Sequence, residues 1–383
     1  MQKEKTPLSI ISVIASMVLV AAGNGLLFTY VPFVLGTRQA ADWFSGAAVT
    51  AVALGGLLGC VIAGPLIRRV GHARLFPVSM AMVIFAALLI AIGFNPLLWV
   101  LARGLYGMAS NVNFIIAQSW INHSASNAWR GRALSFFYMA YILCFGGGSW
   151  LFGQLPAEGN LAPLVTVFLT TAAILPIGLT RLPAPPIPAA LSMTRAVPLA
   201  WRISPVGLVG VLTAGGISMA IQGFTPIYAT ASRVSQQDVG MLILVMQTGL
   251  LFVQYPIGML SDRIDRRTVM LITCGLILAF GIVALTMQFD RLPLLMVVFA
   301  LWAGAIESIY SLANAHANDR ASPEHFVPLS SALLVAWSVG ATAVPMLITA
   351  LTPILGPQTF IHAILLLAIA YALFVLSRMA IRK

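Results

Sequence analysis

The stretch GMLSDRIDRRT at residues 258–268 repeats the pattern of an earlier stretch, GPLIRRVGHAR at residues 64–74. A glycine, a leucine and an arginine recur 194 positions apart in the 383-residue chain. One position reverses its charge, because Arg68 in the first stretch corresponds to Asp262 in the second. A motif that returns after half of the chain indicates two equivalent halves.

The composition predicts a membrane protein. Hydrophobic residues make up 60% of the chain and charged residues only 8%, whereas a soluble domain has about 25% charged residues. Apolar runs of about 20 residues, enough to cross a hydrocarbon core of about 30 Å, recur along the whole sequence. The sequence therefore predicts an all-α polytopic protein embedded in the lipid bilayer. We place twelve spans at residues 9–35, 42–66, 74–94, 96–122, 129–153, 161–181, 205–231, 237–261, 267–288, 292–316, 324–350 and 355–379.

The net charge of +11 is explained by topology. If both termini are cytoplasmic, the cytoplasmic segments hold 17 of the 21 Lys and Arg residues and the outer loops hold three. This asymmetry follows the positive-inside rule. It argues against nucleic acid as a partner and predicts a multi-pass protein of the bacterial inner (cytoplasmic) membrane. The first span lacks a cleavage site and is expected to be retained.

No pattern in the chain predicts a cofactor or a metal. Cys60, Cys144 and Cys274 lie singly in different spans, so they form neither a disulfide framework nor a metal-ligand spacing. The sequence has no G-x-x-x-x-G-K-[ST] loop, which disfavours ATP-driven pumping. Ser149 in GGGSW is a weak candidate for a protease nucleophile, because the GxSG motif is missing. We therefore expect no enzymatic activity.

The two halves are joined by a polar segment rich in proline. Residues 181–204 contain five prolines and are predicted to be extended or turn-rich rather than helical. The expected division is an N-terminal bundle at 1–181, a cytoplasmic linker at 182–204 and a C-terminal bundle at 205–383. Further matches at the offset of 194 are Pro32 with Pro226, Gly46 with Gly240, Gly55 with Gly249, and Gly146 with Gly340.

Several motifs carry a family resemblance. The pattern G-x-L-x-D-R-x-x-R-R at 258–267 resembles the signature loop of the major facilitator superfamily, and Arg103 in RGLYGMA is similar to the helix-4 arginine of many members. GPLIRR, RGRALSFFYMAY (130–141) and ILPIGLTR (174–181) resemble the YcaD-like bacterial branch. The resemblance implies twelve transmembrane helices in two pseudo-symmetric six-helix bundles, with alternating access by a rocker-switch motion in a monomer. Two departures argue against a motif-based efflux assignment: the first loop lacks the signature Asp, and GGGSWLFG (146–153) lacks the Gly-Pro pair of many drug antiporters.

The family resemblance also implies contacts for the two repeated loops. The loop after span 2 is expected to pack against the start of span 11, so that Arg68 meets Glu324. The loop after span 8 is expected to pack against the start of span 5, so that Asp262 meets Arg130 or Arg132. Alternatively, these residues are ordinary cytoplasmic loop charges. The predicted cytoplasmic gate comprises Arg68, Arg69, Asp262, Arg263, Arg130, Arg132 and Glu324.

Two formal charges inside the predicted spans, Arg103 and Glu307, are the first candidates for transport chemistry. At a rise of about 1.5 Å per residue, Arg103 lies about 10 Å and Glu307 about 22 Å from the outer ends of their helices. This difference argues against a direct ion pair. A carboxyl group buried without a counter-charge is favoured in its protonated form, which suits a proton-binding group. The alternative for both residues is a structural hydrogen-bonding role.

Polar and aromatic residues within the spans are candidates for a substrate cavity, although each is also consistent with a helix–helix contact. Tyr310 and Asn314 share a helix face with Glu307, and Asn113 is the counterpart of Glu307 in the first half. The favoured function is a proton-coupled secondary transporter of a small organic solute. The alternatives are an uncoupled facilitator and, less favoured, a membrane receptor or enzyme. The cavity candidates are Asn24, Phe28, Asn111, Asn113, Gln118, Gln222, Tyr228, Gln247, Gln254, Tyr310 and Asn314.

Overall fold

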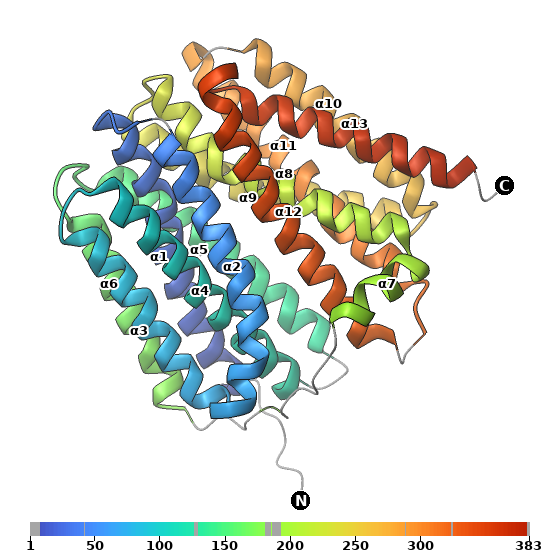
Figure 1. Cartoon of the computed structure of the whole chain (residues 1–383), viewed down its shortest axis with the longest axis horizontal. Helices are drawn as coiled ribbons and strands as arrows, with labels where there is room; N and C mark the ends of the chain where they lie inside the picture. Colours follow the sequence, from blue (N-terminus) through green and yellow to red (C-terminus); the bar gives the residue numbers. More distant parts are fainter. Residues whose placement is uncertain are drawn as a thin grey trace, which may run out of the picture. The chain divides into compact units, whose positions relative to one another are not determined.

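The computed structural model describes residues 8–41, 43–125, 129–180, 185, 193–287, 289–322 and 325–380. Its described secondary structure is entirely helical (Figure 1). The first half contains α1 (Leu8–Thr37), α2 (Trp43–Val70), α3 (His72–Ala91), α4 (Pro96–Ser124), α5 (Arg130–Gln154) and α6 (Leu161–Gly178). The second half contains α7 (Met193–Ile203), α8 (Pro205–Ala231), α9 (Gln236–Ser261), α10 (Arg266–Thr286), the 3-10 turn η1 (Phe289–Arg291), α11 (Leu292–Asn318), α12 (Phe326–Leu355) and α13 (Thr359–Ala380).

The helices have the lengths and compositions of membrane spans. Eleven of the described helices are long and apolar enough to cross a bilayer. The 29-residue α4 is the other long helix in the described part of the chain, and it carries Arg103 and the polar residues that the sequence singled out. The prediction of an all-α polytopic membrane protein is confirmed.

The chain forms two compact units. The first comprises Met1–Ala189 and Ser235–Leu244, and the second comprises Ala190–Val234 and Val245–Lys383. Helix α9 therefore contributes to both units. Its first residue, Gln236, donates hydrogen bonds to the carbonyl oxygens of Phe152 (2.6 Å) and Leu155 (2.7 Å) at the end of α5, which joins the start of α9 to the first unit.

The first unit is built around α1, which packs against α5, α6, α4 and α2. The approach of α1 to α5 depends on glycine, because a Cβ atom at Gly25 would collide with the backbone carbonyl of Phe145. Ser149 of α5 donates a hydrogen bond of 2.9 Å to the carbonyl of Gly25. This buried contact gives Ser149 a helix-packing role.

The second unit repeats this arrangement around α8. Helix α8 packs against α12, α11 and α13, and α8 and α12 correspond to α1 and α5 at the offset of 194 residues. A Cβ atom at Gly215 would collide with the carbonyl of Trp337, so this pair also meets through a glycine. The duplication seen in the sequence is thus a duplication of helix packing within each unit.

The structure corrects the prediction that the whole of residues 181–204 is extended or turn-rich. Residues Met193–Ile203 form α7, which packs on α12 through one face. Ala196 and Ala200, one turn apart, are buried, and the Trp201 ring lies 6.3 Å from the ring of Phe374. One proline inside a helix removes a single backbone hydrogen bond, and the packing of this apolar face offsets the loss at Pro198.

Candidate functional site

Glu307 of α11 accepts hydrogen bonds from two side chains of α8. The amide Nε2 of Gln222 donates to Glu307 Oε1 at 2.9 Å, and the Ser218 hydroxyl donates to the same oxygen. Ser218 and Gln222 are one helical turn apart, so they present both donors on the same face of α8. This arrangement suits an ionised carboxylate and also the carbonyl oxygen of a protonated carboxylic acid. Gln222 was among the sequence candidates, whereas Ser218 was not.

The polar face of α11 continues beyond Glu307. Tyr310 forms a hydrogen bond with Asn314, and Asn318 donates to Asn314 Oδ1 at 2.9 Å. Residues three and four positions apart lie on one face of a helix. The predicted alignment of Tyr310 and Asn314 with Glu307 therefore agrees with the hydrogen bonds, and Asn318 extends it by one turn.

Arg103 of α4 is buried in the first unit, with 2% of its surface exposed. Its guanidinium carbon lies 5.5 Å from the ring centroid of Phe28 and 5.3 Å from that of Tyr106. No carboxylate of the described first unit forms an ion pair with it, and its Nη1 has no hydrogen-bond partner among the described residues. Arg103 is thus a buried cation held by aromatic rings rather than by a counter-charge.

Asn24 and Phe28, two sequence candidates on α1, lie in this part of the first unit. Phe28 contacts Arg103 and also packs edge-on against Phe145 of α5, with ring centroids 5.5 Å apart. Asn24 donates a hydrogen bond of 3.3 Å to the Tyr141 hydroxyl of α5. Residues of α1 and α4 therefore flank the guanidinium, and α5 packs against the α1 residues Asn24 and Phe28. Tyr106 and Tyr141 were not among the sequence candidates.

Three polar candidates of α4 make contacts with neighbouring helices. Asn111 donates to the carbonyl of Gly56 (2.5 Å) on α2. Asn113 accepts a hydrogen bond of 2.5 Å from the Ser79 hydroxyl of α3, and Gln118 donates to the Tyr138 hydroxyl of α5. These bonds match the alternative helix–helix role that the sequence left open.

The remaining candidates of the second unit are dispersed. Tyr228 accepts a hydrogen bond of 3.1 Å from Gln358 and lines a surface hollow of about 470 Å³ beside Phe289. Gln247 is buried and Gln254 is half-buried on α9. The described contacts do not bring Tyr228, Gln247 or Gln254 to the carboxyl group of Glu307.

The second repeated loop is organised by ion pairs inside the second unit. Arg266 lies 3.6 Å from Asp262 and donates a hydrogen bond of 2.6 Å to Asp319 at the end of α11. Its Nη1 also donates to the Ser261 hydroxyl at 3.0 Å. The contact with Asp319 was not foreseen from the sequence, because it links residues 53 positions apart.

The predicted gate residues occupy the expected helix ends. Arg68 and Arg69 lie in the last turn of α2, Arg130 and Arg132 lie in the first turn of α5, and Arg263 follows α9. Glu324 lies outside the described residues, so its pairing with Arg68 stays a prediction. The pairing of Asp262 with Arg130 or Arg132 also stays a prediction.

Asp265 is the N-cap residue of α10 and lies at the end of this loop. Its carboxylate accepts a hydrogen bond of 2.7 Å from the backbone N–H of Arg267 and pairs with the guanidinium of Arg267 at 2.9 Å. Hydrogen bonding to Arg267 lowers the pKa of Asp265 to about 2. The carboxylate is therefore ionised throughout the physiological range.

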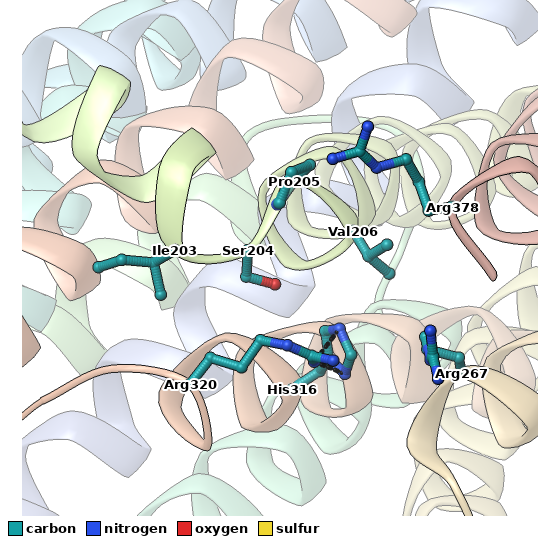
Figure 2. A pocket seen from close by; sticks show the side chains of 8 residues that line it. All are labelled: Ile203, Ser204, Pro205, Val206, Arg267, His316, Arg320 and Arg378. Atoms are coloured by element: carbon teal, nitrogen blue, oxygen red, sulfur yellow. Dashed lines mark hydrogen bonds between the residues drawn. The ribbon is translucent and has the colours of Figure 1, made fainter. Parts of the chain in front are cut away.

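A small basic cavity lies where α8 begins in the second unit (Figure 2). Its volume of about 20 Å³ is close to the minimum of about 10–15 Å³ that one water molecule needs, so it is too small for a solute. Figure 2 shows the Arg320 guanidinium against the His316 ring, with Nη1 of Arg320 2.8 Å from Nδ1 of His316. The cavity is lined by Ile203, Ser204, Pro205, Val206, Arg267, His316, Arg320 and Arg378.

Comparison with known proteins supports one family. A family model described as Major Facilitator Superfamily matches residues 206–382. A protein of Escherichia coli O139:H28 named "Uncharacterized MFS-type transporter YcaD" is 26% identical over 375 residues, which cover 97% of this chain and 94% of that protein. A YcaD of Shigella sonnei has the same identity and coverage.

Solved transporter structures have the same fold. A mutant form of the nucleoside transporter NupG gives a TM-score of 0.80 at 14% identity, over 98% of this chain and 100% of that one. A bacterial homolog of the human lysosomal transporter Spinster, in an inward-facing and unoccupied conformation, gives a TM-score of 0.72 at 13% identity, over 98% and 95% of the two chains. The helical fold, the internal duplication and the similarity along nearly the whole sequence lead to one conclusion: this chain has the fold of major facilitator superfamily transporters and is similar to them over nearly its whole length.

Proposed function

We propose that the protein is a proton-coupled secondary transporter that moves a small organic solute across the bacterial inner membrane by alternating access. Both termini face the cytoplasm, as the distribution of Lys and Arg indicates, and the transporter works as a monomer. In this proposal Glu307 binds and releases the coupling proton.

The observation that carries the proposal is the environment of the Glu307 carboxyl group. It is held within a membrane-spanning helix by the neutral donors Ser218 and Gln222. Ionisable groups inside a membrane are costly and mark proton or ion pathways. Neutral donors can serve the carboxyl group in both protonation states, whereas a fixed cation would hold it ionised. This environment therefore supports reversible protonation.

The cytoplasmic gate is a second part of the proposal. Arg68 pairs with Glu324, and Asp262 pairs with Arg130 or Arg132, when the cytoplasmic side is closed. Exposed ion pairs contribute less than about 1 kcal/mol each, so they bias the conformational equilibrium rather than hold the fold. The exchange of Asp262 between Arg266, its partner within the second unit, and Arg130 would accompany the conformational change.

Uptake into liposomes that contain the purified protein tests the proposal. A solute panel is first screened with and without an imposed pH gradient, and the compound that accumulates is then used with variants. Glu307→Gln keeps the size of the side chain and a carbonyl oxygen that can accept the two hydrogen bonds, but it cannot ionise. We therefore expect solute exchange to persist and gradient-driven accumulation to be lost. Glu158→Gln is the matched control, because Glu158 is exposed in the loop after α5. Normal accumulation by Glu307→Gln would overturn the assignment.

The uncoupled facilitator is the rival function. It predicts that the protein equilibrates the solute but never concentrates it, whatever the direction of the pH gradient. The same liposome experiment on the unmodified protein separates the two, because only a coupled carrier produces an inside concentration above the outside concentration.

A further inference from the structure

The face of α4 that carries Arg103 holds three buried polar groups whose hydrogen-bonding capacity is not filled. These are Nη1 of Arg103, which has no hydrogen-bond partner among the described residues, and the hydroxyl groups of Tyr106 and Ser110, which interact with each other and have no further hydrogen-bond partner in the described part of the chain. The spacing of three and then four residues places them on one face of the helix. The contact between Tyr106 and Ser110 uses only one of their two hydroxyl protons. Buried polar groups are nearly always satisfied, so the unused hydroxyl proton beside Nη1 of Arg103 indicates a site for an acceptor.

The charge of the site is set by Arg103. A guanidinium is protonated at every physiological pH and has no acceptor atom, and here it is 2% exposed with no carboxylate paired to it in the described first unit. The rings of Phe28 and Tyr106 compensate part of its desolvation by cation–π contact. Contact with ring faces leaves the N–H groups at the edge of the guanidinium free to donate, and these groups match the oxygens of a carboxylate or phosphate.

The neighbouring helices α1 and α5 add further polar side chains beside Tyr106. Tyr141 of α5 lies near Tyr106, and its hydroxyl is held by Asn24 of α1 at 3.3 Å. Tyr141 can therefore donate its own proton while it accepts from Asn24. Phenol and hydroxyl groups donate readily to an oxyanion, and hydrogen bonds to a charged partner are shorter and stronger than neutral ones.

We infer that Arg103, Tyr106 and Ser110 form a subsite for an oxyanion of the transported solute, so that the substrate class is an organic carboxylate or phosphate. The inference rests on the proposed function in one respect, that the chain carries a small solute. It does not depend on proton coupling by Glu307, which belongs to the other unit.

Matched pairs of charged and neutral compounds test the subsite by thermal unfolding of the purified, detergent-solubilised protein. The probes are benzoate with benzamide, pantothenate with panthenol, and glycerol 3-phosphate with glycerol. We expect at least one oxyanion to raise the Tm of the unmodified protein while its neutral partner does not. The first two pairs report a carboxylate and the third a phosphate. If no oxyanion raises the Tm more than its neutral partner, the inference is wrong.

Variants then locate the binding. Removal of a charged hydrogen-bond donor weakens binding by about 10- to 100-fold, so Arg103→Gln should abolish the stabilisation by the oxyanion. Tyr106→Phe and Ser110→Ala keep the helix packing and remove one donor each, which should weaken the same binding by about 3- to 10-fold. The matched controls are Arg74→Gln, at an exposed arginine, and Tyr255→Phe, at a tyrosine that is 70% exposed.

Two outcomes separate this inference from the proposed function. If Tyr106→Phe and Ser110→Ala bind the oxyanion as tightly as the unmodified protein, the subsite is wrong even where Arg103→Gln fails to fold. If Glu307→Gln still accumulates the solute while oxyanion binding requires the α4 donors, proton coupling by Glu307 is wrong and the subsite stands.

Discussion

Gln222 of α8 and Glu307 of α11 share a hydrogen bond of 2.9 Å, and the Ser218 hydroxyl donates to the same carboxyl oxygen. The two donors are one turn apart on α8, and Ser218 Oγ also lies 3.4 Å from Gln222 Nε2. The three side chains therefore form one connected polar group between α8 and α11. A change in any member should alter the behaviour of the carboxyl group, which makes this relationship open to direct testing.

The first prediction concerns the coupling between Ser218 and Glu307. Ser218→Ala removes one donor, worth about 0.5–1.5 kcal/mol, so solute exchange and gradient-driven uptake should both slow by about 2- to 10-fold. In the background of Glu307→Gln the same change should have no further effect, because Ser218 acts through the carboxyl group. Because Glu307→Gln is expected to keep solute exchange only, the cycle compares the exchange rates of the two single variants and the double variant. Independent, additive losses would contradict the coupling.

The second prediction concerns the contact between α1 and α5. Gly25→Ala would place a methyl group against the carbonyl of Phe145 and strain the hydrogen bond from Ser149. Overpacking of this kind costs about 1–3 kcal/mol, so the Tm and the yield of folded protein should fall. Gly147→Ala is the control on the same pair of helices, because its new methyl group meets no atom within 4 Å. Equal Tm values for the two variants would argue against a close approach at Gly25.

The third prediction concerns the pH dependence of the loop before α10. The pKa of Asp265 is lowered from 3.8 to about 2 in the folded protein, so its stabilising effect is present above the unfolded value and lost as the pH falls toward the folded value. Asp265→Ala should therefore lower the Tm by the same amount between about pH 8 and about pH 5.5. Because the carboxylate is 47% exposed, the stabilising effect of the ion pair is under about 1 kcal/mol. A difference in Tm that already shrinks near pH 6 would contradict the lowered pKa.

The fourth prediction concerns the proposed cytoplasmic gate. Arg68→Glu should impair transport, and the double change with Glu324→Arg should restore it, because the exchanged charges attract as the original ones do. Uptake rates are the measurement, and Arg69→Glu with Glu324→Arg is the control for a general effect of loop charge. If neither double variant restores transport, the pairing of Arg68 with Glu324 is wrong and Arg68 is an ordinary loop charge.

The helical fold could be predicted from the sequence because the composition leaves few alternatives. Hydrophobic residues make up 60% of the chain and form runs long enough to span a bilayer. Such runs form helices, because a backbone inside the bilayer must satisfy its own hydrogen bonds. The repeat of residues 64–74 at 258–268 also predicted two equivalent halves. The structure adds the helix packing that they share, in which α1 meets α5 and α8 meets α12. Helix α7 was missed because the neighbouring prolines outweighed the amphipathic pattern of residues 193–203.

The candidate site was only partly predictable, since side-chain partners depend on tertiary packing. Asn111 and Asn113 are two positions apart, which is about 200° around a helix, and they accordingly bond to α2 and α3. Ser218 carried no signal because a serine in an apolar helix usually bonds to its own backbone. Tyr106 could have been found from its position one turn after Arg103.

The unpaired guanidinium of Arg103 has an electrical consequence. A fixed positive charge inside a bilayer responds to the membrane potential, and moving one elementary charge across the whole membrane changes its energy by about 2.3 kcal/mol per 100 mV. A bound oxyanion would cancel the charge of Arg103 and make this part of the carrier insensitive to voltage. The carrier without solute keeps the uncompensated charge of Arg103 inside α4. Voltage should therefore act mainly on the step in which the carrier returns without its solute.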